Sequence, residues 1–207
     1  MTFPFMPGLI HKPVPTLIGL SVAPNAAADA SLTLAAPAHI PGDYLIAITG
    51  NRTATPPAVV SGFTDLGGQA ASIASGTRSL RVQYLVATST ALTISYVGSY
   101  AHIWVIRGAR KLGAFNMYRA DTASGVIPIP DLTGLARSES TIIASTYVAG
   151  LTTSVTSPFA LVDTSAIGVI ISNTRGLNSS LSGKSMTLTI PGGTSGTIHV
   201  SYALELV

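Results

Sequence analysis

The side chains that could carry out acid–base chemistry are few and spread along the 207-residue chain. A glycosidase needs two carboxyl groups across one cleft, so paired acidic residues are the first candidates. Asp43 and Asp65 both fall at expected strand-edge turns, and Glu139 and Asp163 do so later in the chain. An Asp in a turn bonds nearby backbone amides, which explains these positions without catalysis. The acidic residues are Asp29, Asp43, Asp65, Asp121, Asp131, Glu139, Asp163 and Glu205.

The residues that bind metals or activate nucleophiles form no known pattern. The histidines are His11, His39, His102 and His199, without an HxH or HExxH motif, and there is no cysteine. No G-x-S-x-G elbow occurs, and the glycines of "PGGTSG" at 191–196 are expected in a hairpin loop rather than a phosphate-binding loop. We therefore predict no catalytic residue, no metal ligand and no cofactor.

The chain is also poor in charge. Charged residues make up 9% of it, against about 25% in ordinary soluble domains, and the net charge is +3. The basic residues are scattered, and their densest group, "RGARK" at 107–111, is expected to be a strand-end turn, so no nucleic-acid site is predicted. No apolar run reaches the roughly 18 residues of a membrane span. So little charge indicates a surface coated with small hydroxyls or covered by neighbouring subunits.

The N-terminal residues 1–16 are predicted to form an extended arm. Pro4, Pro7, Pro13 and Pro15 interrupt any helical signal segment and favour polyproline II geometry. The apolar side chains of the arm are costly to leave in water, so we expect them to lie along a partner subunit. These assembly residues are Phe3, Phe5, Met6, Leu9 and Ile10.

The rest of the chain has the pattern of β-strands. Short apolar runs recur every 10 to 15 residues or so, separated by Gly, Pro, Asn and Ser, which is typical of an antiparallel sandwich. No window keeps a helical period with caps. The segment 110–135 is expected to form the crossover between the halves. The expected strands are 16–22, 31–37, 42–50, 78–88, 91–98, 100–109, 125–130, 140–150, 159–165, 167–174, 184–193 and 197–207.

The two halves of the chain repeat one order of segments. "GDYLIA" precedes "SGFTDLG" as "STIIAS" precedes "SPFALVD", and each half closes with a hairpin that carries His102 or His199 on its last strand. We predict an all-β fold, a two-sheet antiparallel sandwich that is jelly-roll-like and built from related halves, about 17–110 and 111–207. Two related sets of strands can stack as one sandwich or stand as two small units. Because neither half has enough core to be independent, we expect one domain, 17–207. Whether residues 16–37 pair within the chain or with a partner stays open.

Four segments together resemble a pattern in structural proteins of tailed bacteriophages. They are "PGDYLIAITGN", "GFTDLG", "LRVQYLVAT" and "AHIWVIRGA". In the phage proteins, the pattern is a GD-led apolar strand, a Gly-aromatic-Thr turn, a strand ending in Tyr, and a closing Trp strand that ends in an Arg-Gly-Ala turn. The resemblance covers about residues 40–110 well and the second half loosely. It implies a β-sandwich component of a virion, of the head-decoration, collar, tail or fibre-attachment type.

These expectations combine into one functional hypothesis and one alternative. The first is a non-enzymatic structural component of a tailed-phage virion, a homo-oligomer that contacts other virion proteins through flat sheet interfaces and the arm. The alternative is a carbohydrate-binding or receptor-binding sandwich module. Its glycan contacts would be Tyr100, Trp104 and Tyr118, although a Trp on so apolar a strand more often belongs to the core.

Overall fold

The computed structural model of the chain is all-β in the residues that it describes. None of those residues belongs to a helix that could cross a bilayer. The described residues are 14–23, 26–73, 76–124, 126–135, 140–148, 151–155, 160–163, 169–173, 185–189 and 197–207.

Fifteen strands are described, and they divide between the two halves of the chain. Those of the first half are β1 (Thr16–Val22), β2 (Ala30–Ala35), β3 (Tyr44–Asn51), β4 (Thr64–Ile73), β5 (Gly76–Val86), β6 (Thr93–Gly98) and β7 (Tyr100–Arg107). Those of the second half are β8 (Leu112–Ser124), β9 (Val126–Pro128), β10 (Thr141–Val148), β11 (Leu151–Val155), β12 (Ala160–Asp163), β13 (Val169–Asn173), β14 (Ser185–Thr189) and β15 (Thr197–Leu206).

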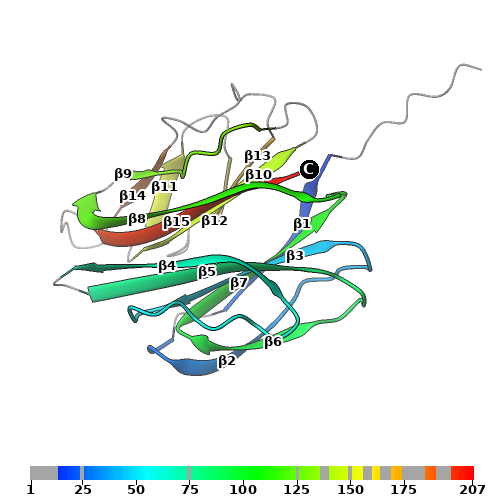
Figure 1. The fold of residues 1–207 in the computed structure, drawn as a ribbon, viewed down its shortest axis with the longest axis horizontal. Coiled ribbons are helices and arrows are strands. Elements are labelled where there is room, and N and C mark those ends of the chain that lie inside the picture. Colours follow the sequence, from blue (N-terminus) through cyan, green and yellow to red (C-terminus); the bar gives the residue numbers. More distant parts are fainter. Residues whose placement is uncertain are drawn as a thin grey trace, which may run out of the picture.

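The strands form layers of antiparallel sheet (Figure 1). Two five-stranded sheets, ordered β1-β7-β3-β5-β4 and β12-β13-β10-β15-β8, lie face to face in the middle. The two-stranded sheet β2-β6 covers the outer face of the first, and the three-stranded sheet β11-β14-β9 lies beyond the second. The predicted all-β antiparallel sandwich is confirmed, with two small outer sheets added to the two expected.

Both large sheets follow one strand order when each half is counted from its own first strand. From the edge inward, the first sheet begins β1-β7-β3 and the second begins β8-β15-β10, so each starts with the first and then the last strand of its half. Tyr44 of β3 pairs with Ile106, and Thr141 of β10 pairs with Leu206. In this register His102 corresponds to Tyr202, not to His199.

The core has two parts because the first large sheet is covered on both faces. Ile46 and Trp104 face the second large sheet and pack in one cluster with Tyr202 and Leu204. We call this cluster the central core. Leu45 and Ile103 face the other way and pack with residues of β2 and β6, including Leu34, Ile94 and Tyr96. Double coverage explains why β3 is apolar on both faces, as its sequence suggested.

Strands β4, β8 and β11 were not predicted. β4 contains Gly67, Gly68 and small alanines, which are poor strand formers. β8 occupies the segment 112–124, which was expected to be a crossover. Residues 16–37, left open by the sequence, pair within the chain, since β1 pairs with β7 and β2 with β6. The arm residues Phe3, Phe5, Met6, Leu9 and Ile10 lie outside the described residues.

The edges of the two large sheets are irregular, whereas their centres are regular. The pairings of β3 with β5 and β7, and of β10 with β13 and β15, run without a register shift. Each edge strand, β1, β4, β8 and β12, has a shift against its neighbour. Bulges at sheet edges disfavour edge-to-edge pairing with other chains.

Candidate functional site

Asp43 forms a structural ion pair with Arg107. Its carboxylate accepts hydrogen bonds from Arg107 Nε at 3.0 Å and Arg107 Nη2 at 2.8 Å, and from the amide of Ile40 at 3.0 Å. The Arg107 guanidinium lowers the pKa of Asp43 below its ordinary value, although burial acts in the opposite direction. The pair ties the turn before β3 to the end of β7.

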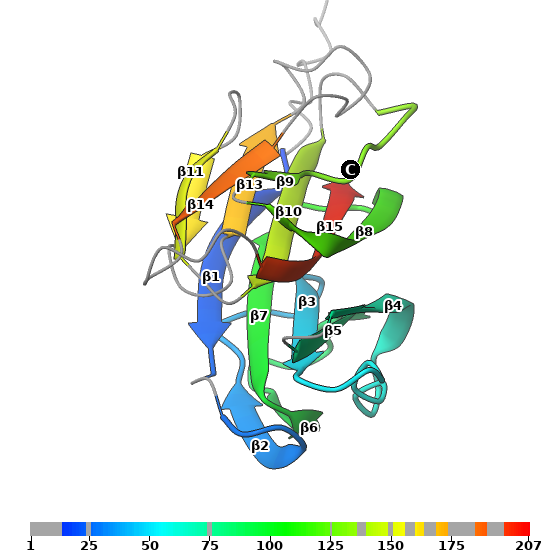
Figure 2. The same cartoon turned by 90° about the vertical axis from the view of Figure 1, so that its left-hand side faces the viewer.

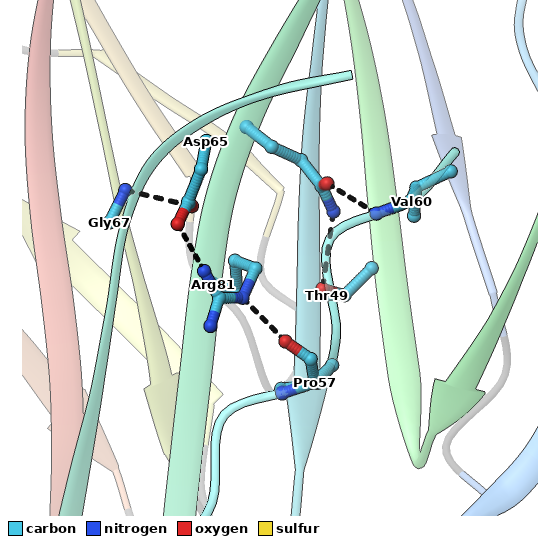
Figure 3. A network of polar contacts seen from close by, with 7 residues as sticks. Thr49, Pro57, Val60, Asp65, Gly67 and Arg81 are labelled. Carbon is cyan, nitrogen blue, oxygen red and sulfur yellow. Dashed lines mark hydrogen bonds and ion pairs between the residues drawn. The ribbon is translucent and has the colours of Figure 1, made fainter. Parts of the chain in front are cut away.

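Asp65 belongs to a second network, drawn in Figure 3. It accepts a hydrogen bond from the amide of Gly67 at 3.1 Å and pairs with Arg81, whose Nε donates to the carbonyl of Pro57. The side-chain amide oxygen of Gln83 accepts a 2.7 Å hydrogen bond from the backbone amide of Val60. These bonds fasten β4 and the loop that precedes it onto β5.

Two further carboxylates hold strand ends. Asp29 has a φ of 54° and accepts a 2.6 Å hydrogen bond from the Asn51 side chain. Glu205 is buried on β15 and accepts a 3.3 Å bond from the amide of Ala114 on β8. The side chains of Asp121, Glu139 and Asp163 lie outside the described part. Among the described residues, no three His, Asp or Glu side chains group to hold a metal.

The predicted aromatic platform is wrong for two of its three members. Tyr100 and Trp104 are 1% and 0% exposed, because their strand β7 turns them into the central core. A buried ring cannot stack on a sugar. Tyr118 is 40% exposed, but it lies on the edge strand β8, away from the other two.

One open groove lies where the two halves of the chain meet. Its volume is about 400 Å³, and it is lined by Ala54, Pro56, Gly68, Gln69, Ala70 and Arg119. All but Arg119 belong to β4 or to the loop before it, whereas Arg119 comes from β8 in the other half. Arg119 Nη1 donates a 3.4 Å hydrogen bond to the carbonyl of Ala70. Arg119 of β8 thus closes one side of a groove whose other lining residues come from β4 and its loop.

A second exposed surface is the outer face of β2 and β6. Its side chains alternate with those that fill the core, and all of them are exposed and uncharged. The pairing of the strands places Thr33 opposite Ser95 at its centre. We call this surface the hydroxyl face; it consists of Ser31, Thr33, Ala35, Thr93, Ser95 and Val97.

The sequence signals for these two surfaces differ in strength. The alternation in "SLTLA" was recognised, and it is the pattern that produces the hydroxyl face. The groove could not be foreseen, because neither β4 nor β8 was expected as a strand. No protein-family profile, curated protein or solved structure matches the chain.

Proposed function

We propose that the chain is a non-enzymatic structural subunit that joins copies of itself or other virion proteins through sheet faces. The observation that carries this proposal is the hydroxyl face. It is exposed, it bears no charge, and Val97 at its margin is 50% exposed. Such a face can be covered by a second flat surface without leaving a buried, unpaired charge behind, which is the main cost of burying polar surface.

The irregular edges favour faces over edges as the contact surfaces. A regular, open edge would let copies pair strand to strand into fibres. Shifts at β1, β8 and β12 oppose that mode of growth, and at β4 the shift is confined to the start of the strand, between Asp65 and Gly67. Contacts between sheet faces are therefore favoured over contacts between strand edges. Such contacts can build a closed homo-oligomer.

The acidic residues support a structural role. Asp29, Asp43, Asp65 and Glu205 each hold a turn or a strand end through a hydrogen bond. None of these four carboxylates lines the open groove. The assignment to a tailed-phage virion is supported by the resemblance of residues 40–110. The glycan-binding alternative keeps only Tyr118 among its three aromatics.

The face contact is tested by placing charge on it. We expect the purified chain to associate in sedimentation experiments, and we expect Thr33→Lys with Ser95→Lys to weaken association at least about tenfold. Like charges brought together across an interface cost several kcal/mol, and 1.4 kcal/mol corresponds to tenfold. Thr64→Lys, at an exposed threonine of β4, is the matched control. A chain that stays monomeric, or a double variant that associates like the control, contradicts the proposal.

The arm is tested by deleting residues 1–13. The deletion keeps Pro15, whose carbonyl accepts the Thr141 hydroxyl bond, so the sheets should keep their thermal unfolding temperature. We expect assembly to weaken, because the apolar arm residues would no longer cover a neighbour. Unchanged association of the truncated chain would remove the arm from the proposal and leave the face contact standing.

A further inference from the structure

The groove at the meeting of β4 and β8 wraps around the outer edge of β4, the last strand of its sheet among the described residues. In the pairing with β5, Gly68 lies opposite Arg81 and Ala70 opposite Ser79. Arg81 and Ser79 bond the loop carbonyls of Pro57 and Thr55, so this face of β4 is the one that the loop covers. The opposite face of β4 points to the second half. The groove thus has the loop on one side, Arg119 on the other, and the edge of β4 between them.

Gly67 and Gly68 show how closely the walls approach β4. A Cβ on Gly67 would lie 3.3 Å from Cε1 of Phe115 and 3.5 Å from Sδ of Met117, both on β8. A Cβ on Gly68 would lie 2.9 Å from Cβ of Pro56, on the other face. β4 lies beside β8 in both views of the fold (Figures 1 and 2). The lack of side chains at Gly67 and Gly68 therefore allows both walls to approach β4 closely.

The edge of β4 is regular where the groove crosses it. β4 is the last strand of its sheet in the described part of the chain. Its register shift lies between Asp65 and Gly67, and from Gly67 to Ile73 the pairing with β5 is continuous. The carbonyl of Ala70 faces outward, since it accepts the bond from Arg119. Successive outward groups of such a strand can bond a further strand.

The charge of the groove is positive and uncompensated by the described residues. Arg119 is exposed, and its hydrogen bond to Ala70 is long, at 3.4 Å. No described carboxylate forms an ion pair with it, whereas the neighbouring Arg81 is neutralised by Asp65. The lining contains neither an acidic residue nor an aromatic ring. An arginine in this setting fits a carboxylate.

We infer that the groove binds an extended segment of a partner polypeptide, which adds to the edge of β4 and places an Asp or Glu side chain on Arg119. Main-chain bonds to a free strand edge supply affinity, and the side-chain pocket supplies specificity. The chain's own residues 1–13 do not fit, because they contain Lys12 and no acidic residue. The lack of an aromatic ring in the lining disfavours a sugar, which would stack on one. This site is independent of the hydroxyl face and of the proposed assembly.

The inference is tested by amide chemical-shift changes of the full chain on titration with capped peptides. The probes are Thr-Val-Glu-Val-Thr, the same peptide with Gln for Glu, and free glucuronic acid. We expect the Glu peptide to shift the amides of residues 68–72. Its affinity should fall about threefold to tenfold with the Gln peptide or with the Arg119→Gln variant, the range for a charged hydrogen bond at an exposed site.

Two further variants complete the test. Arg110→Gln changes another exposed arginine and should bind like the wild type. Ala70→Pro removes an outward amide, which an edge strand tolerates, and should abolish the shifts; if it does not fold, Arg119→Gln still decides. Equal binding of the Glu and Gln peptides overturns the carboxylate contact. Glucuronic acid binding as well as the Glu peptide overturns strand addition, and no shift with any probe overturns the site.

Discussion

At the scale of single residues, the few charges of this chain hold turns and strand ends in place. Asp43 joins Arg107 across the sequence, and Asp65 joins Arg81. The sequence predicted that Asp43 and Asp65 lie at turns and bond nearby amides. The bonds to Ile40 and Gly67 confirm the amide contacts, but only Asp43 lies at a turn, since Asp65 lies in β4 next to its register shift. Their arginine partners could not be predicted, because they lie on other strands and depend on sheet register.

The pair of Asp43 and Arg107 makes folding stability depend on pH. Because the folded-state pKa of Asp43 is below the ordinary value of 3.8, its contribution is complete above that value and is lost as the pH falls below it. We expect Asp43→Asn to lower the free energy of unfolding at neutral pH by about 1–3 kcal/mol. The difference from wild type should shrink toward pH 3, as measured by urea unfolding at a series of pH values.

Arg107→Gln is the companion variant, since it removes the other partner. Arg107 is half exposed, whereas the Asp43 side chain is only 3% exposed. Removing Arg107 therefore leaves the Asp43 carboxylate as a buried charge without its partner. The variant should therefore lose stability at neutral pH and should regain most of it when Asp43 is protonated. A stability difference that is the same at every pH would show that the ion pair is unimportant.

At the scale of elements, close contacts with glycine decide where strands can lie. β1 has its bulge between Leu17 and Gly19, and Gly19 lies against Pro37 of the following segment. β4 was not predicted because Gly67 and Gly68 interrupt its strand pattern. The same two glycines allow β8 to approach one face of β4 and the preceding loop to approach the other. Strands such as β3 were predictable because a strand buried on both faces has a continuous run of apolar residues. A glycine-rich edge strand has no such run.

We expect Gly19→Ala to destabilise the protein by about 1–3 kcal/mol, the usual cost of overpacking. A Cβ at this position would lie 2.6 Å from Cβ of Pro37, and a proline ring has little freedom to move away. Ser21→Ala, on the same strand, is the control for the effect of a substitution in β1. The measurement is the midpoint of thermal unfolding, and equal midpoints for the two variants would show that β1 shifts without cost.

At the scale of the whole molecule, the two halves share one core. Trp104 of the first half and Tyr202 of the second are both fully buried in the central core. Burial raises the pKa of the Tyr202 phenol, and its hydroxyl finds no hydrogen-bond partner among the described residues. The sequence indicated two halves with the same order of segments. It did not show which strands of the two large sheets meet, because β4 and β8, which lie against each other, were not predicted as strands.

The shared core predicts that the halves unfold together. Separating them would expose several large side chains, such as Ile46, Trp104 and Leu204, at about 1.5–3 kcal/mol each, so a state with one half folded is unfavourable. We expect Leu204→Ala in the second half and Ile94→Ala in the outer core of the first half each to cost about 2–5 kcal/mol. Native-state hydrogen exchange measures the stability of each half separately. Each substitution should lower the protection of β3 and β10 amides by the same amount, and a loss confined to the substituted half would show that the halves are separate folding units.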